Sequence, residues 1–315
     1  MSDIGNSAKF GSFVPIGRPD ADPKKNPMVA AVVLSATLRS LRLSVGMKQA
    51  AAAKSATMSP SKLCKLEHGD LLPQRQDLDL LAAAYGIIPA QKAWLITLTD
   101  LARQPPEWQR AGITVLPSMS QLVGLEPAAE RLWTYEADLV SGLFQTNAYM
   151  RAVMARSQPP LSIDEAEERV ETRLYRQKKL FADLPECIVV LDESILHRRL
   201  GSRETMVEQI DRLLEVARNP CIQVRIFPLA GEQVLAGVRS LTQLEFGRTS
   251  TGLPSVIYLE TDDKSKYFAK GEQAEEKNAP SYDRYSTTLL MLLGGAADRD
   301  VSLEMLEEAR QRFAR

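Results

Sequence analysis

Two closely spaced helix-boundary signals constrain the fold of this sequence more than any other feature. Ser59 followed by Pro60 is a strong helix start, because serine caps the first turn and proline suits the first helical position. Gly69 stands where a helix commonly ends. With Leu63 and Leu66 between them, these signals predict a short helix that has one apolar face.

Three further short helices are predicted around this segment. Glycines end two of them, and a run of four alanines, the residue with the highest helix propensity, lies in another. The predicted ranges are 29–43, 48–56 and 76–85. Four short helices in roughly sixty residues make a compact all-α unit, in which the second and third helices have the design of a helix-turn-helix.

The charge of this helical segment differs from that of the rest of the chain. From Met28 to Arg75 there are seven basic residues and two acidic ones, whereas the whole chain has 39 basic and 40 acidic residues. A basic module attached to an acidic body is the electrostatic footprint of nucleic-acid binding. On charge alone, a solvated helical surface that is merely rich in lysine explains the same count.

The stretch from Gly46 to Gly69, GMKQAAAAKSATMSPSKLCKLEHG, resembles the phage-repressor-like (XRE, Cro/C1-type) helix-turn-helix. The positions that match or nearly match that family's pattern are Gly46, Gln49, Ala53, Ser59, Ser61, Leu63, Leu66, Glu67 and Gly69. Lys48 departs from it by replacing a capping threonine, and Ala52 and Ala56 by replacing larger core residues. Thr57 replaces the glycine of the turn. The resemblance implies a lambda-repressor-like fold and DNA binding.

The resemblance also implies roles for individual residues. The positions from which the family contacts DNA are occupied here by Gln49, Ser59, Ser61, Lys62 and Lys65. Lys48 is expected to add a phosphate contact. Lysine donates to guanine O6 and N7, and serine contacts bases or phosphates, so which residues touch a base stays open. Arg42 and Glu67 match a pair that forms a structural ion pair in some members, and Cys64 is expected to pack.

We expect two structured parts and a tail. Residues 1–27 are rich in Gly, Ser, Pro and Asp without a sustained apolar period, and are expected to form a flexible N-terminal tail. The helix-turn-helix DNA-binding domain is assigned to 28–88 and a helical linker to 89–119. Residues 120–315 are assigned to a second domain.

The second domain is predicted to be mixed α+β. Its helices are expected at 126–133, 147–156, 164–180, 204–217, 282–293 and 302–313. Its strands are expected at 188–191, 222–226, 240–246 and 256–260. The predicted fold class is therefore an all-α helix-turn-helix domain followed by a mixed α+β domain.

Several blocks of the second domain resemble, in order, a domain without established activity that many actinobacterial helix-turn-helix regulators carry. These blocks begin at Val123 (VGLEPAAERLWTYEADLVSGLFQTNAYMRAVM), Arg173 (RLYRQ), Val189 (VVLDESILHRRLG), Asn219 (NPCIQVRIFPLAGEQ) and Val256 (VIYLET). The chain is thus similar to WhiJ-like, antitoxin-like regulators, whose members are often encoded beside a small partner protein. The resemblance implies that the second domain binds such a partner.

Metal-dependent and membrane functions find no support in the sequence. The three cysteines, Cys64, Cys187 and Cys221, lie far apart and form no zinc-ligand spacing with His68 and His197, so neither a metal nor a cofactor is predicted. Neither a run of roughly 18 apolar residues nor a signal-peptide pattern occurs, so no membrane partner is expected. The expected location is the cytoplasm, in association with the nucleoid.

Three hypotheses for the second domain follow. The leading one is a homodimeric repressor that binds double-stranded DNA, with the second domain serving dimerisation or binding a small partner protein. A domain that senses a small molecule is the alternative. An enzyme comes last: Asp192, Glu193 and His197 suit acid–base work, but the two acids equally suit a helix start. No nucleophile elbow or glycine-rich phosphate loop accompanies them.

Overall fold

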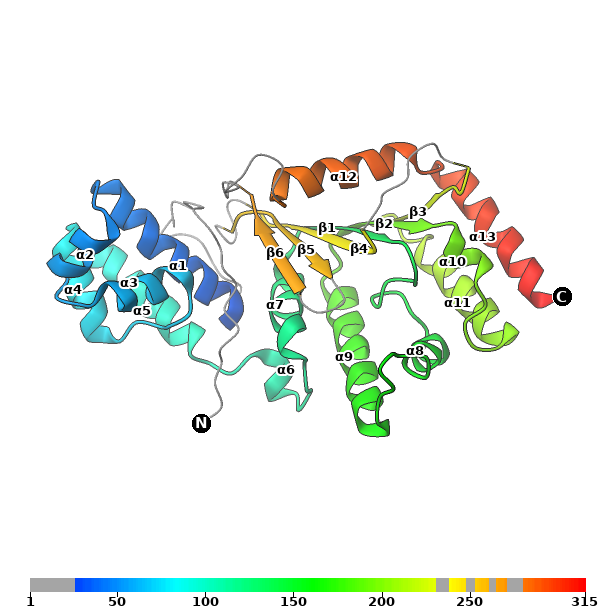
Figure 1. Ribbon diagram of the computed structural model, residues 1–315, viewed down its shortest axis with the longest axis horizontal. Helices are drawn as coiled ribbons and strands as arrows, with labels where there is room; N and C mark the ends of the chain where they lie inside the picture. The colour runs from blue at the N-terminus through cyan, green and yellow to red at the C-terminus, as the bar shows by residue number, and fades with distance from the viewer. Residues whose placement is uncertain (1–25, 231–237, 248–252, 261–264, 271–279) are drawn as a thin grey trace.

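The computed structural model describes residues 26–230, 238–247, 253–260, 265–270 and 280–315 (Figure 1). It has an all-α N-terminal region and a second region built on a six-stranded mixed sheet, which confirms the predicted fold class. The tail predicted at 1–27 lies almost entirely outside the described residues. Its last two residues belong to the first helix, because Asn26 Oδ1 accepts the backbone N–H of Met28 at 3.0 Å and Pro27 begins the helix.

The N-terminal region consists of short helices packed on one long one. Its helices are α1 (Pro27–Ser44), α2 (Gln49–Ser55), α3 (Pro60–His68), α4 (Arg75–Tyr85), α5 (Pro89–Ala102) and α6 (Glu107–Arg110). Leu38 of α1 and Leu63 of α3 are fully buried, as the apolar spacing predicts. Residues 89–102, assigned above to a linker, form α5, which packs against α1 and α4.

The first four helices end in the same way. One or two positions past each helix end lies a residue with a left-handed backbone, with φ values of +69° at Gly46, +52° at Thr57, +80° at Gly69 and +67° at Gly86. In each case the next N–H bonds the carbonyl five residues back, at 2.9–3.2 Å. This is the Schellman motif, in which glycine is the usual left-handed residue because it has no Cβ. Only Thr57 among these four carries a side chain.

The sheet has the strand order β3-β2-β1-β4-β5-β6. Its strands are β1 (Arg131–Glu136), β2 (Glu186–Asp192), β3 (Ile222–Phe227), β4 (Ser240–Glu245), β5 (Val256–Glu260) and β6 (Ser265–Ala269). The first three are parallel, and β4, β5 and β6 follow as an antiparallel meander. The parallel strands need helical crossovers, which are α8 (Asn147–Met154), α9 (Ile163–Ala182), α10 (Ser194–His197) and α11 (Arg203–Val216).

Helices cover both faces of the sheet (Figure 1). Helix α12 (Tyr282–Gly295) packs on one face, over side chains such as Tyr135 and Ile257. The other face is covered by the crossover helices and α13 (Arg299–Ala314), which pack on Val189 and Val224. Both faces are therefore buried, at least in part, which explains the continuous apolar run of β2.

One predicted helix is wrong. Residues 126–133 form a single 3₁₀ turn (Glu126–Ala128) and then the start of β1, the strand that joins the parallel half of the sheet to the antiparallel half. Local composition favours a helix there, but pairing with β2 on one side and β4 on the other satisfies the backbone of β1 along its whole length. Helix α7 (Pro117–Leu125) and strand β6 were not predicted.

Helix α7 joins the two regions through buried contacts. It packs on α1, and Asn26 Nδ2 donates to the carbonyl of Gly124 at 2.7 Å. A Cβ at Gly124 would lie 2.9 Å from Met28 Cβ, so only glycine allows this approach. On its other side, the hydroxyl of Tyr267 in β6 accepts from Leu122 N at 3.2 Å and donates to Ser118 O at 3.1 Å.

Candidate nucleic-acid interface

Helix α3 presents a small polar surface at its N-terminal end. Ser59 Oγ accepts the backbone N–H of Lys62 at 3.1 Å, and Pro60 occupies the first helical position, as the sequence predicts. Leu63 turns into the core. Ser61 and Lys65 are exposed on the outer side of the helix, which makes their side chains available to a ligand as large as DNA.

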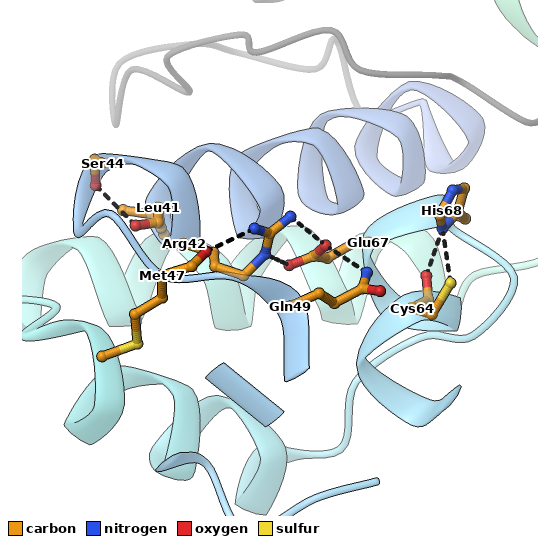
Figure 2. A network of polar contacts seen from close by, with 8 residues as sticks. All are labelled: Leu41, Arg42, Ser44, Met47, Gln49, Cys64, Glu67 and His68. Atoms are coloured by element: carbon orange, nitrogen blue, oxygen red, sulfur yellow. Dashed lines mark hydrogen bonds and ion pairs between the residues drawn. The ribbon is translucent and has the colours of Figure 1, made fainter. Parts of the chain in front are cut away.

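A buried ion pair fixes the angle between α1 and α3 (Figure 2). Arg42 donates from Nε to Glu67 Oε1 at 2.6 Å and from Nη2 to Glu67 Oε2 at 3.0 Å. Its third nitrogen, Nη1, donates to the carbonyl of Met47 at 2.8 Å. The side chains are 9% and 1% exposed, and the hydrogen bond to Glu67 raises the pKa of Arg42. The pair therefore ties three segments together away from solvent.

Gln49, the first residue of α2, also binds the Arg42–Glu67 ion pair. Its Nε2 donates to Glu67 Oε2 at 3.0 Å, so its amide, expected to contact a phosphate, faces the ion pair in this structure (Figure 2). The side chain is half-buried. The clamp of Arg42, Glu67 and Gln49 thus places the start of α2 against the end of α3, and this arrangement sets the direction in which α3 projects.

Lys62 is engaged in a second contact within the protein. Its Nζ lies 2.5 Å from Asp77 Oδ1, and the Asp77 side chain is only 6% exposed. Asp77 Oδ2 also accepts the backbone N–H of Gln74, which caps α4. Sequence reasoning missed Asp77, because an acid at the third position of a helix has a sufficient local explanation as a cap. Lys62 holds α3 against the start of α4.

The remaining residues named from the sequence take different positions. Lys48 is the exposed N-cap residue of α2, and its side chain makes no cap hydrogen bond. Cys64 is half-buried in α3 and has a free thiol. His68 Nδ1 lies 2.7 Å from the carbonyl oxygen of Cys64 and 3.4 Å from its sulfur, so both residues face each other along one side of the helix (Figure 2).

The acid–base residues of the second region serve local structure. Asp192 Oδ1 accepts the backbone N–H of Ser194 at 2.9 Å and so starts α10. His197 faces Glu193 at 3.1 Å and Arg312 at 3.0 Å. Asp192 and His197 therefore have different partners and form no shared acid–base pair.

The described residues contain no group of three or more His, Cys, Asp or Glu side chains that could hold a metal ion. No single helix among them is long and apolar enough to cross a membrane, although α1 and α2, bent by 95° relative to each other, pass that test as a pair.

The second region matches a known protein family. Residues 119–308 match the family model of a domain of unknown function, DUF5753. The chain belongs to the DUF5753 family. In this DUF5753 protein, residues 33–95 also match the model of a helix-turn-helix domain, a range that includes the clamp and all of α3. That match indicates DNA binding and a role in transcription regulation. No curated protein and no solved structure matches the chain.

Proposed function

We propose that this DUF5753 protein is a sequence-specific transcriptional repressor of the phage-repressor-like type, which docks α3 in the major groove of double-stranded DNA. The observation that carries the proposal is the projection of α3. Its cap leaves Ser61 and Lys65 exposed, while the Arg42–Glu67 clamp holds its far end rigidly against α1. A recognition helix needs such a fixed scaffold, since base contacts depend on its orientation in the groove.

The predicted DNA contacts divide by their surroundings. We assign Ser61 and Lys65 to the base edges, because both are exposed and extend from the first turns of α3. Ser59 and Lys48 are exposed at the starts of α3 and α2 and suit phosphate oxygens. Lys62 and Gln49 are already bonded to Asp77 and Glu67. In this proposal they keep those bonds when they contact DNA, so their main contribution is to position the two helices.

We further propose that the protein acts as a homodimer in the cytoplasm, associated with the nucleoid, and has no catalytic activity. A single helix-turn-helix covers a short site, and dimers place two recognition helices on half-sites about 34–36 Å apart. In this proposal residues 28–88 read DNA, and the second domain, from about residue 120, supports dimerisation or binds a small partner protein. Sedimentation equilibrium of the full chain, with and without operator DNA, tests the dimer.

Fluorescence anisotropy against DNA from the protein's own promoter region tests DNA reading. Lys65→Ala and Ser61→Ala should weaken binding to that DNA more than to unrelated DNA. Lys178→Ala is the matched control, because Lys178 is an exposed lysine on α9 of the second region. Removing a lysine that contacts a phosphate should also reduce the slope of log affinity against log salt concentration by about one. Equal binding by wild type, Lys65→Ala and Ser61→Ala to every DNA would refute the proposal.

A further inference from the structure

A pocket that DNA binding does not use lies between α12 and the sheet. Its volume is about 240 Å³. Trp133 of β1 and Gln243 and Glu245 of β4 line it from the sheet, Asp283 from the first turn of α12, and Lys270 from the residue after β6. The second region thus has a cavity of small-molecule size.

Two of the side chains that line this pocket each carry a buried polar atom without a partner among the described residues. Trp133 and Gln243 are directly opposite each other in the β1–β4 pairing, so their side chains stand side by side on one face of the sheet. Trp133 Nε1 and Gln243 Oε1 are both buried, and neither has a hydrogen-bond partner within the part of the chain that the structure describes. Gln243 is only 4% exposed. Buried polar groups are nearly always hydrogen-bonded, so this adjacent pair points to a ligand.

The donor and acceptor roles of the pair are fixed. An indole N–H only donates. The amide of Gln243 is oriented by Glu245, whose Oε1 accepts from Gln243 Nε2 at 2.6 Å and whose Oε2 accepts from Arg131 Nη1 at 2.9 Å. Because a carboxylate in an ion pair only accepts, the amide nitrogen must face Glu245, which leaves the oxygen as the free acceptor.

A ligand that satisfies both atoms offers a carbonyl oxygen to Trp133 and an N–H to Gln243 along one edge. An open-chain secondary amide does not, because its trans geometry places the N–H and the carbonyl on opposite sides. A ring holds the amide cis, so a cyclic amide presents both groups on the same side. Two carboxylates, Glu245 and Asp283, line the pocket against one ammonium, Lys270, which disfavours a ligand with several negative charges.

We propose that this pocket binds a small, neutral cyclic amide, the chemical class that includes lactams and the oxo forms of nucleobases. The carbonyl accepts from Trp133 Nε1–H and the ring N–H donates to Gln243 Oε1. The proposal gives the small-molecule hypothesis for the second domain a place in the fold. It is tested without DNA, so its failure and the failure of the DNA-reading proposal are separate results.

Isothermal titration calorimetry of the full chain tests the proposal with three probes. Uracil and 2-piperidone share the cyclic amide edge and distinguish a nucleobase from a simple lactam. The third probe, 1,3-dimethyluracil, keeps the carbonyls but has no N–H. We expect saturable binding of at least one of the first two and at least about tenfold weaker binding of the third, the factor that corresponds to one lost hydrogen bond.

Variants locate the binding site. Gln243→Leu should weaken binding of the N–H probe about tenfold or more. Thr242→Val is the matched control on the opposite face of β4, where Thr242 contacts Thr134, and it should bind as wild type does. The proposal is overturned if neither cyclic amide binds, if 1,3-dimethyluracil binds as well as uracil, or if folded Gln243→Leu retains full affinity. If Gln243→Leu does not fold, the comparison of probes on the wild-type chain decides.

Discussion

Replacing Thr57 by glycine should stabilise the helix-turn-helix. Thr57 occupies the left-handed position of the Schellman motif that ends α2, at φ +52°, and Gly46, Gly69 and Gly86 fill the same position in three neighbouring helices. Its N–H bonds Lys54 O at 3.1 Å, and the N–H of Met58 bonds Ala53 O at 2.9 Å, so the motif is complete despite the side chain.

The size of the effect follows from two opposing terms. A left-handed backbone costs a residue with a Cβ roughly 1–2 kcal/mol. Glycine loses about 0.5–1 kcal/mol more conformational entropy on folding. The net gain for Thr57→Gly is therefore roughly 0–1.5 kcal/mol, with a central value of about 0.75 kcal/mol. The central value corresponds to a rise in Tm of roughly 3–6 °C if the helical region unfolds alone, and about half of that if it unfolds together with the sheet.

Differential scanning calorimetry of three variants beside the wild-type chain gives the test. Gly86→Thr makes the reverse change at an equivalent cap, where a Cβ meets no atom within 4 Å, so it isolates the backbone cost and should lower Tm. The Tm of Thr57→Asn should lie between those of wild type and Thr57→Gly, because asparagine tolerates a left-handed backbone better than threonine does. Suppose that the Tm of Thr57→Gly is at or below that of wild type and that the Tm of Gly86→Thr is unchanged. The left-handed backbone at position 57 then has no measurable cost in stability, and the reasoning is refuted.

Three further predictions concern buried contacts. Arg42→Ala leaves the carboxylate of Glu67 buried without its counterion, so urea unfolding should show a loss of about 3–5 kcal/mol. Gly124→Ala forces a Cβ against Met28, so hydrogen exchange in α1 should rise, with a cost of roughly 1–3 kcal/mol. Burial raises the pKa of Glu136 to about 8. Because the folded state then holds a proton that the unfolded state releases near pH 4.5, stability should fall as pH rises from 5 to 8, and Glu136→Gln should remove that slope.

The fold of the helix-turn-helix region follows closely from local sequence. The start of α3 needs only Ser59 and Pro60, and the helix ends need only glycine, because caps are made by residues that are neighbours in the chain. For the same reason, the sequence alone shows that Thr57 replaces the glycine of the family's turn. Long periodic segments such as α9 and α11 were predicted for the same reason, because one continuous segment of sequence contains the whole apolar face of the helix.

Contacts between distant segments were not predictable in this way. The central strand β1 was predicted as a helix because its strand state depends on β2 and β4, which lie far along the chain. Lys62 was expected to face DNA, and the structure pairs it with Asp77 of another helix. The Trp133–Gln243 pair likewise exists only through the register of β1 and β4, so no spacing within the sequence marks the pocket.

A series of packed and hydrogen-bonded contacts connects the two proposed sites. Lys270, at the pocket, directly follows β6, and Tyr267 of that strand holds α7 through two hydrogen bonds. Helix α7 meets α1 through the close approach of Gly124 to Met28, and α1 carries Arg42, which binds Glu67 of α3. Because each link is packed or hydrogen-bonded, we expect a shift of β6 to be passed through α7 to α1. A ligand that binds with different affinity to two positions of β6 would therefore change the DNA affinity of α3, and DNA would change the affinity for that ligand by the same factor.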